Sequence, residues 1–183
     1  MKSITFITGN ENKLKEVKRY LKVPIEHQKL DLIEIQSLDV YEVVEAKVKE
    51  AYKILQKPVF VEDVSFILPA LGNFPGPLVK WFMQELENEG ISNLMKHYED
   101  KSAIATVLYG FYDGTKVHFF EGQMRGTIAE TPKGEYSFGF AKIFIPDGYT
   151  KRLAEIPTEE QEAIAYRRKA LKKFEVFLEK YEK

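Results

Sequence analysis

The sequence contains no cysteine among its 183 residues, and this absence removes several kinds of chemistry at once. Disulfides, zinc–thiolate sites and thiol nucleophiles are all excluded. Only three histidines are present, so a bound metal must be held by oxygen ligands or by these scattered rings. His27, His97 and His118 share no metal-ligand spacing, and we interpret all three as structural or surface residues.

An excess of charge of either sign is also absent. The 27 Lys and Arg residues nearly balance the 28 Asp and Glu residues, which gives a formal net charge of -1. This balance disfavours both a strongly basic nucleic-acid binder and an acidic disordered chain. No apolar run approaches the roughly 20 residues of a membrane-spanning helix, and charged residues follow the first apolar stretch. We therefore expect a cytoplasmic protein with neither a membrane nor a nucleic acid as partner.

Apolar and aromatic residues, at 44% and 13% of the chain, are plentiful enough to build a core. The length fits one domain on the usual scale of roughly 100–200 residues per domain. No internal repeat, low-complexity stretch or linker rich in Pro, Gly and Ser interrupts the sequence. These features predict a single domain over residues 1–183.

The first part of the chain alternates between strand and helix patterns. Residues 4–7 predict a short buried strand, and residues 8–10 break it ahead of an amphipathic helix. Residues 40–55 predict a second helix, which leads into a fully apolar strand at residues 58–61. That strand is predicted to end at Glu62-Asp63.

The second part of the chain predicts more helix and then an antiparallel meander. Helical patterns cover residues 78–86 and 91–97. Strand patterns at residues 103–112 and 116–120 flank Asp113-Gly114, which is a strong hairpin signal. Helices interleaved with strands favour an α/β fold, in which helices flank a mixed sheet.

The last helix is predicted to begin at Thr158, because Thr158 and Gln161 fit a capping box. Helical spacing places Arg167 on the same inward face as Ala170. A buried guanidinium needs an anionic acceptor. We expect Arg167 to contact a base carbonyl or a phosphate of a ligand. The alternative is a structural ion pair with an acid such as Glu155.

A candidate phosphate loop joins the first strand to the first helix at residues 8–13. Gly9 permits close backbone approach, amides at the helix N-terminus can bind an anion, and Lys13 supplies a counter-charge. The spacing is not that of a Walker motif. The alternative interpretation is that Asn10 simply caps the helix and Lys13 is solvated.

Two adjacent carboxylates follow the apolar strand at residues 58–61. Because successive strand residues point to opposite faces, only one of Glu62 and Asp63 is expected to face a given cleft. Carboxylates near a phosphate loop suggest Mg²⁺, a hard cation that prefers oxygen ligands. The alternative is that both acids begin a solvated turn.

An aromatic pair around a glycine, Phe138-Gly139-Phe140, offers a surface on which a base could stack, although core packing is the usual role of a single Phe. The rigid turn at residues 73–77 is interpreted as structural. Neither a serine-centred elbow nor a glycine-rich dinucleotide fingerprint is present, which argues against serine hydrolases and Rossmann enzymes.

Several short segments stand in a characteristic order along nearly the whole chain. They are Thr8-Gly9-Asn10 with Lys13, Glu34-Ile35-Gln36, Val61-Glu62-Asp63, Phe74-Pro75-Gly76-Pro77 with Lys80-Trp81-Phe82, Phe120 and Gly122 with Gly126, Phe138-Gly139-Phe140, Ile143-Phe144-Ile145-Pro146, Ala154-Glu155 and Arg167. In this combination the chain resembles the inosine triphosphate pyrophosphatase family, which clears non-standard purine nucleoside triphosphates.

This resemblance implies an elongated mixed α/β fold with two lobes around a central cleft, usually as a homodimer. It implies Mg²⁺-dependent hydrolysis of a nucleoside triphosphate such as ITP, dITP or XTP to the monophosphate and pyrophosphate. Glu34 and Asp63 would hold the metal, and Asp63 would also accept the proton of the attacking water. The implied substrate-binding residues are Thr8, Gly9, Asn10, Lys13, Lys47, Phe138, Gly139, Phe140, Gln161, Tyr166 and Arg167.

Four sites depart from the family pattern. Ala141 stands where Asp is usual, Gln161 where Lys is usual and Val64 where a small hydroxyl residue is common. Ala165-Tyr166 replaces Ser-His. Lost hydrogen-bond partners can change discrimination between bases by orders of magnitude, so the base preference is open.

The resemblance and these departures leave two functional hypotheses. The first is the pyrophosphatase, in which Asp63 is expected to be indispensable while Glu62 matters less. The alternative is a nucleotide-binding sensor or interaction protein of the same fold, with weak or no catalysis.

Overall fold

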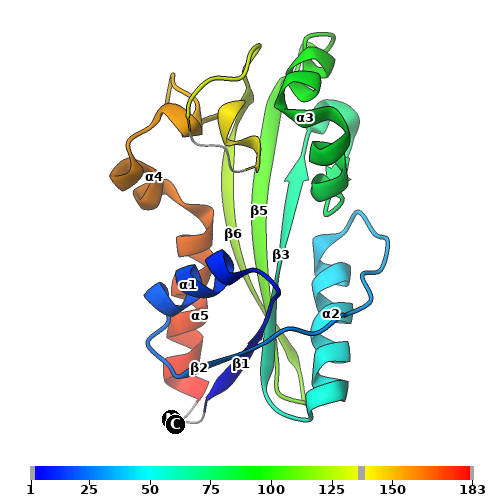
Figure 1. The fold of residues 1–183 in the computed structure, drawn as a ribbon, viewed down its shortest axis with the longest axis vertical. Coiled ribbons are helices and arrows are strands. Elements are labelled where there is room, and N and C mark those ends of the chain that lie inside the picture. Colours follow the sequence, from blue (N-terminus) through cyan, green and yellow to red (C-terminus); the bar gives the residue numbers. More distant parts are fainter. Residues whose placement is uncertain (1–2, 136–138, 182–183) are drawn as a thin grey trace. The chain divides into compact units, whose positions relative to one another are not determined.

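A computed structural model describes residues 3–135 and 139–181. Its elements (Figure 1) are β1 Ile4–Ile7, α1 Glu11–Tyr20, β2 Ile25–Gln28, α2 Val40–Leu55, β3 Val59–Ile67, η1 Pro69–Leu71, β4 Pro75–Gly76, α3 Val79–Met95, β5 Ser102–Tyr112, β6 Val117–Ile128, η2 Gly139–Lys142, β7 Phe144–Pro146, η3 Leu153–Glu155, α4 Thr158–Ile164 and α5 Tyr166–Tyr181. None of the helices within these described ranges is long and apolar enough to span a bilayer.

One sheet contains every strand of the described residues, in the order β2-β1-β3-β5-β6-β7, with β4 paired to β3. Strand β1 is parallel to both β2 and β3, whereas β4 is antiparallel to β3 and β7 is antiparallel to β6. The sheet is therefore mixed and flanked by helices, which confirms the predicted α/β class. The hairpin prediction is also confirmed, because β5 and β6 are neighbours joined through a turn in which Gly114 has a φ of +100°.

The chain divides into two compact units. The first unit comprises Met1–Asp63, Val107–Gly122 and Arg167–Lys183, and the second comprises Val64–Thr106 and Gln123–Tyr166. Strands β3, β5 and β6 contribute residues to both units. The single domain over residues 1–183 stays a prediction.

The core of the first unit shows how β3 presents alternate residues to different helices. Val59 and Val61 pack in a buried cluster with Val44 and Val48 of α2. Phe60, between them, instead contacts Phe174 of α5, at 5.2 Å between ring centroids. In Figure 1, α2 lies on one side of β1 and β3, and α1 and α5 lie on the other. Even-numbered side chains of this stretch therefore face α5, and odd-numbered ones face α2.

The core of the second unit is aromatic. Phe66 stacks on Phe140 with the ring centroids 4.2 Å apart, and Phe144 meets Phe66 edge-on. The Asn88 side chain donates a hydrogen bond to the carbonyl oxygen of Gly139, which ties α3 to η2. These contacts give Phe140 the core-packing role that the sequence left open.

Two expected element boundaries are wrong. Strand β3 does not end at Glu62-Asp63 but continues to Ile67, because its last residues pair with β4. The two helices predicted over residues 78–86 and 91–97 are, by contrast, present as the two parts of α3, which is interrupted at Glu87, where φ is +53°. The last helix is split at Ala165 into α4 and α5.

The capping box expected at the start of α4, a helix that lies wholly within the described residues, is also not formed. Pro157 precedes the helix as its cap residue and offers no side-chain hydrogen bond. The Gln161 amide donates instead to the carbonyl oxygen of Ile156, at 2.7 Å. The Gln161 side chain, predicted to take part in the capping box, therefore binds the backbone of a residue that precedes the helix.

Candidate active site

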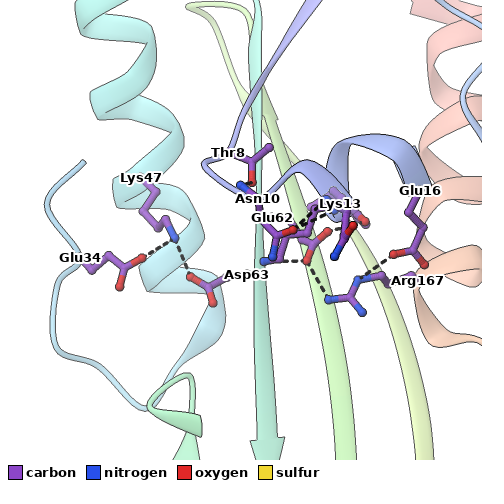
Figure 2. A network of polar contacts seen from close by, with 11 residues as sticks. Thr8, Asn10, Lys13, Glu16, Glu34, Lys47, Glu62, Asp63 and Arg167 are labelled. Atoms are coloured by element: carbon purple, nitrogen blue, oxygen red, sulfur yellow. Dashed lines mark hydrogen bonds and ion pairs between the residues drawn. The ribbon is translucent and has the colours of Figure 1, made fainter. Parts of the chain in front are cut away.

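Glu62 and Asp63 occupy the middle of β3 and point to opposite faces of the sheet, as strand alternation predicts. Figure 2 shows Asp63 with Lys47 on one side of the strand, and Glu62 with Lys13 and Arg167 on the other. Two adjacent carboxylates thus belong to two separate ionic clusters. All of these residues lie in the first unit.

The first cluster joins Asp63 to Glu34 through Lys47. The Lys47 ammonium lies 3.0 Å from Asp63 Oδ2 and 2.9 Å from Glu34 Oε1. Burial lowers the pKa of Lys47, but the two carboxylates outweigh that effect and raise it above its ordinary value. Two carboxylates that are 29 residues apart therefore converge on one lysine.

The second cluster is centred on Glu62. Its Oε1 lies 3.0 Å from the Lys13 ammonium and 3.1 Å from Arg167 Nη2. Its Oε2 accepts a hydrogen bond from the Tyr109 hydroxyl, at 2.7 Å. Arg167 Nε also lies 3.5 Å from Glu16 Oε2. Arg167 thus has acidic partners within the chain, but Glu155, the partner named from the sequence, instead pairs with Arg152.

Electrostatics keep this second carboxylate charged. Burial raises the pKa of Glu62, yet Lys13, Arg167 and the Tyr109 hydroxyl together lower it to about 2. Burial and the Glu62 carboxylate raise the pKa of Tyr109 well above its ordinary value, so the phenol remains a donor. An ionised carboxylate is stable here because each of its oxygens has a donor.

The loop at residues 8–13 has the capped geometry that the sequence left as one alternative. Asn10 Oδ1 accepts hydrogen bonds from the backbone amides of Asn12 and Lys13. The Asn10 amide in turn donates to Thr8 Oγ1, at 3.1 Å. These three amides are therefore occupied by the loop's own side chains, and the expectation of free amides at this helix end does not hold for them.

Gly9 in the same loop is not required by the fold. Its φ lies outside the left-handed region, and an added Cβ would meet Lys29 at 3.5 Å, which is ordinary van der Waals contact. The residue is exposed. A glycine that neither the backbone nor the packing requires is compatible with close approach of a ligand.

The expected base-binding residues lie on several elements of the second unit. Phe138 lies outside the described residues, whereas Gly139 adopts a φ of +55°. Tyr166 is buried at the start of α5, and Gln161 is held by backbone N-terminal to α4. These residues belong to the second unit, so the first unit contains the phosphate and metal candidates without them.

Sequence reasoning did not select Tyr109 or Glu16. Tyr109 is fully buried in β5 and lies 47 positions from its partner Glu62. One signal was available, because a tyrosine within an apolar strand must find a partner for its hydroxyl when buried. Glu16 lies one helical turn after Lys13 on α1 and offered no comparable signal.

The carboxylate pair fits a magnesium ion. Glu34 and Asp63 supply oxygen donors, and they already meet at a single cationic point, the Lys47 ammonium. Within residues 3–135 and 139–181 no group of three or more acids and histidines could hold a metal. Mg²⁺ is commonly bound by one or two carboxylates together with substrate phosphates, so the pair suffices in chemistry and number.

Comparison with known proteins gives a consistent result across most of the chain. The Ham1 family pattern matches residues 4–177. An inosine triphosphate pyrophosphatase of Yarrowia lipolytica is 42% identical over 181 residues, covering 96% of this chain and 95% of the relative. A dITP/XTP pyrophosphatase of Saccharolobus solfataricus is 36% identical, covering 97% of this chain and 94% of that protein.

A solved structure agrees on the fold. A HAM1 protein from Coxiella burnetii superposes with a TM-score of 0.88 at 22% identity, covering 98% of this chain and all of that one. At this identity the likeness concerns the architecture, a mixed sheet with flanking helices.

Proposed function

The chain belongs to the Ham1 family, and we propose that it hydrolyses non-standard purine nucleoside triphosphates such as ITP, dITP and XTP to the monophosphate and pyrophosphate. One observation carries this proposal. Relatives from Yarrowia and Saccharolobus that align along nearly the whole chain both bear the name of a pyrophosphatase for these nucleotides. The protein is accordingly a diphosphate-releasing hydrolase.

Asp63 is the general base in this proposal. Its carboxylate accepts the proton of the attacking water, and Lys47, 3.0 Å away, holds that carboxylate in place. The Asp63 side chain is 18% exposed, so water can reach it. A positioned base of this kind contributes about 10²–10⁴ in rate.

Glu34 and Asp63 would hold Mg²⁺, which supplies charge neutralisation for the triphosphate when bound. Lys13 and Arg167 stabilise the negative charge that develops on the leaving pyrophosphate. Gly9 supports this placement, because neither the backbone nor the packing requires a glycine there. Thr8 and Asn10, in the same loop as Lys13, are further proposed ligands of the phosphates.

The test is an assay of product identity. Purified protein is incubated with ITP, XTP, dITP and the four standard triphosphates, with Mg²⁺ or with EDTA. We expect pyrophosphate and a monophosphate as first products, with turnover that depends on Mg²⁺. Orthophosphate as the first product, or equal rates in EDTA and Mg²⁺, would contradict the mechanism.

The product assay, together with calorimetric titration of ITP, also distinguishes the enzyme from a nucleotide sensor. Multiple turnovers exclude the sensor, whereas tight calorimetric binding of ITP without product over hours favours it. The names of the relatives favour the enzyme. A homodimer and a cytoplasmic location stay predictions of the sequence and the resemblance.

A further inference from the structure

We propose that Glu62 is a positioning residue, anchored by Tyr109, that fixes Lys13 and Arg167 in the geometry needed to bind substrate phosphates. The inference rests on the proposed function, since it assigns the two cations to the triphosphate. It gives Glu62 a role that the sequence did not suggest, while Asp63 keeps the larger expected effect on turnover. Glu62 acts through its neighbours and has no role in the chemistry itself.

The first argument is that one oxygen organises two cations. Lys13 comes from α1 and Arg167 from α5, yet both reach Oε1 of Glu62, at 3.0 and 3.1 Å. The second oxygen is held by the Tyr109 hydroxyl from β5. The carboxylate therefore cannot rotate without losing a partner, and its position sets that of both cations.

Exposure separates the anchor from the groups that it positions. The Glu62 side chain is 2% exposed, whereas those of Lys13 and Arg167 are 25% and 12% exposed. An anionic ligand can thus reach the cations but not the carboxylate behind them. Glu62 is thus a buried counter-charge beneath two more exposed cations.

Charge gives the anchor its energetic importance. Lys13 and Arg167 share one acceptor atom, so without Glu62 two like charges would lie close together and repel. Lysine also has a long and flexible stem, and holding it before the substrate arrives reduces the entropy lost on binding. Loss of the carboxylate should therefore displace Lys13 and loosen Arg167, which keeps Glu16 Oε2 at 3.5 Å from its Nε.

The decisive variant is Glu62→Gln, which keeps the shape and removes the charge. We expect kcat/KM for ITP to fall about 10–100-fold, since displacement of a positioning group by about 1 Å can cost 10²-fold. The matched control is Glu26→Gln, which removes an exposed carboxylate paired with Lys57 at 2.6 Å. The control should leave kcat/KM within about twofold of wild type.

Binding of inorganic tripolyphosphate, measured by calorimetry, tests the inference without requiring turnover. The variant makes the site more positive by one charge, so simple electrostatics predicts tighter binding. Positioning predicts the opposite, a Kd about tenfold higher. The effect should also shrink in a Lys13→Ala background, as coupled residues require. An unchanged or lower Kd, or an undiminished effect in that background, overturns the proposal.

A second variant covers the case in which Glu62→Gln does not fold. Tyr109→Phe removes only the hydroxyl that holds Oε2, and Tyr41→Phe is its control, because Tyr41 donates to Glu121 at 2.9 Å. We expect Tyr109→Phe to raise the tripolyphosphate Kd at least threefold above the control. Equal affinities would overturn the inference. Absent pyrophosphate release by wild type, by contrast, would contradict only the proposed function.

Discussion

At the scale of single residues, Glu62 and Asp63 differ in what surrounds them more than in chemistry. Glu62 is buried and its two oxygens are engaged by Lys13, Arg167 and Tyr109. Asp63 keeps 18% of its side chain exposed beside Lys47. Water and a metal ion can therefore reach Asp63 but not Glu62. In our two proposals, Asp63 is accordingly the base and Glu62 the anchor.

Asp63→Asn keeps the size of the side chain and removes its charge. Because Asp63 is both the proposed base and a proposed metal ligand, kcat for ITP should fall by about 10²–10⁴. Steady-state kinetics at saturating Mg²⁺ measure this directly. Asp100→Asn, at an exposed position, is the control and should retain wild-type kcat. A kcat of Asp63→Asn within tenfold of wild type would refute the assignment.

The sequence was sufficient to separate the two carboxylates but not to identify their partners. Strand alternation correctly places Glu62 and Asp63 on opposite faces. Glu34 entered only through the family resemblance, because nothing local ties it to Lys47, 13 positions later. Tyr109 was missed for the same reason, since pairing across 47 positions depends on the neighbouring strand.

At the scale of elements, α1 and α2 begin in the same way. Asn10 caps α1 through hydrogen bonds from Asn12 and Lys13, and Asp39 caps α2 through one from Tyr41. Each cap satisfies amides that have no partner within the helix. The difference is that the first turn of α1 contains Lys13, a proposed phosphate ligand.

Matched substitutions of the two caps separate stability from binding. Asn10→Ala and Asp39→Ala should each lower the free energy of unfolding by about 0.5–2 kcal/mol. Only Asn10→Ala should also raise KM for ITP, because the loosened turn carries Lys13. Urea denaturation and steady-state kinetics on both variants check this pair. A similar rise in KM for both variants would show that general destabilisation is responsible.

Helix α2 was predicted with the bounds that the structure gives it, whereas β3 was not. A long apolar periodicity, an Asp at the start and Pro58 shortly after the end define α2 locally. In β3 two adjacent acids looked like a strand end. The strand continues because its last residues pair with β4, and Lys47 and Arg167 neutralise the two acids; sequence patterns contain neither fact.

The split between α4 and α5 has a similar origin. Residues 158–181 carry a continuous helical pattern, yet Ala165 adopts a ψ of 119° and ends the first segment. Alanine favours helix, so local propensity gives no reason for a break here. Ala163 is consequently exposed on α4, whereas Ala170 on α5 is fully buried.

At the scale of the whole molecule, the first unit is assembled from three separate stretches of chain. One connection between them joins the β5–β6 turn to the end of α5, where the Tyr181 hydroxyl donates to Asp113 Oδ2 at 2.7 Å. Thr115 donates to the other oxygen of Asp113. Burial raises the pKa of Asp113, but these hydrogen bonds outweigh it and lower the pKa to about 2.

This lowered pKa makes the stability of the protein depend on acid. Asp113 has an ordinary pKa of 3.8. Between about pH 4 and 2 its carboxylate is therefore protonated in the unfolded chain but still ionised in the folded chain. The stabilisation is therefore complete above that range and is lost as the pH falls through it.

Asp113→Asn should be less stable at neutral pH and should show a shallower fall in melting temperature between about pH 4 and 2. Other acids titrate alike in both proteins, so the difference between the two curves isolates Asp113. Tyr181→Phe, which keeps the Thr115 donors, should give an intermediate slope. Parallel melting curves for wild type and Asp113→Asn over this range would show that the connection contributes nothing to acid sensitivity.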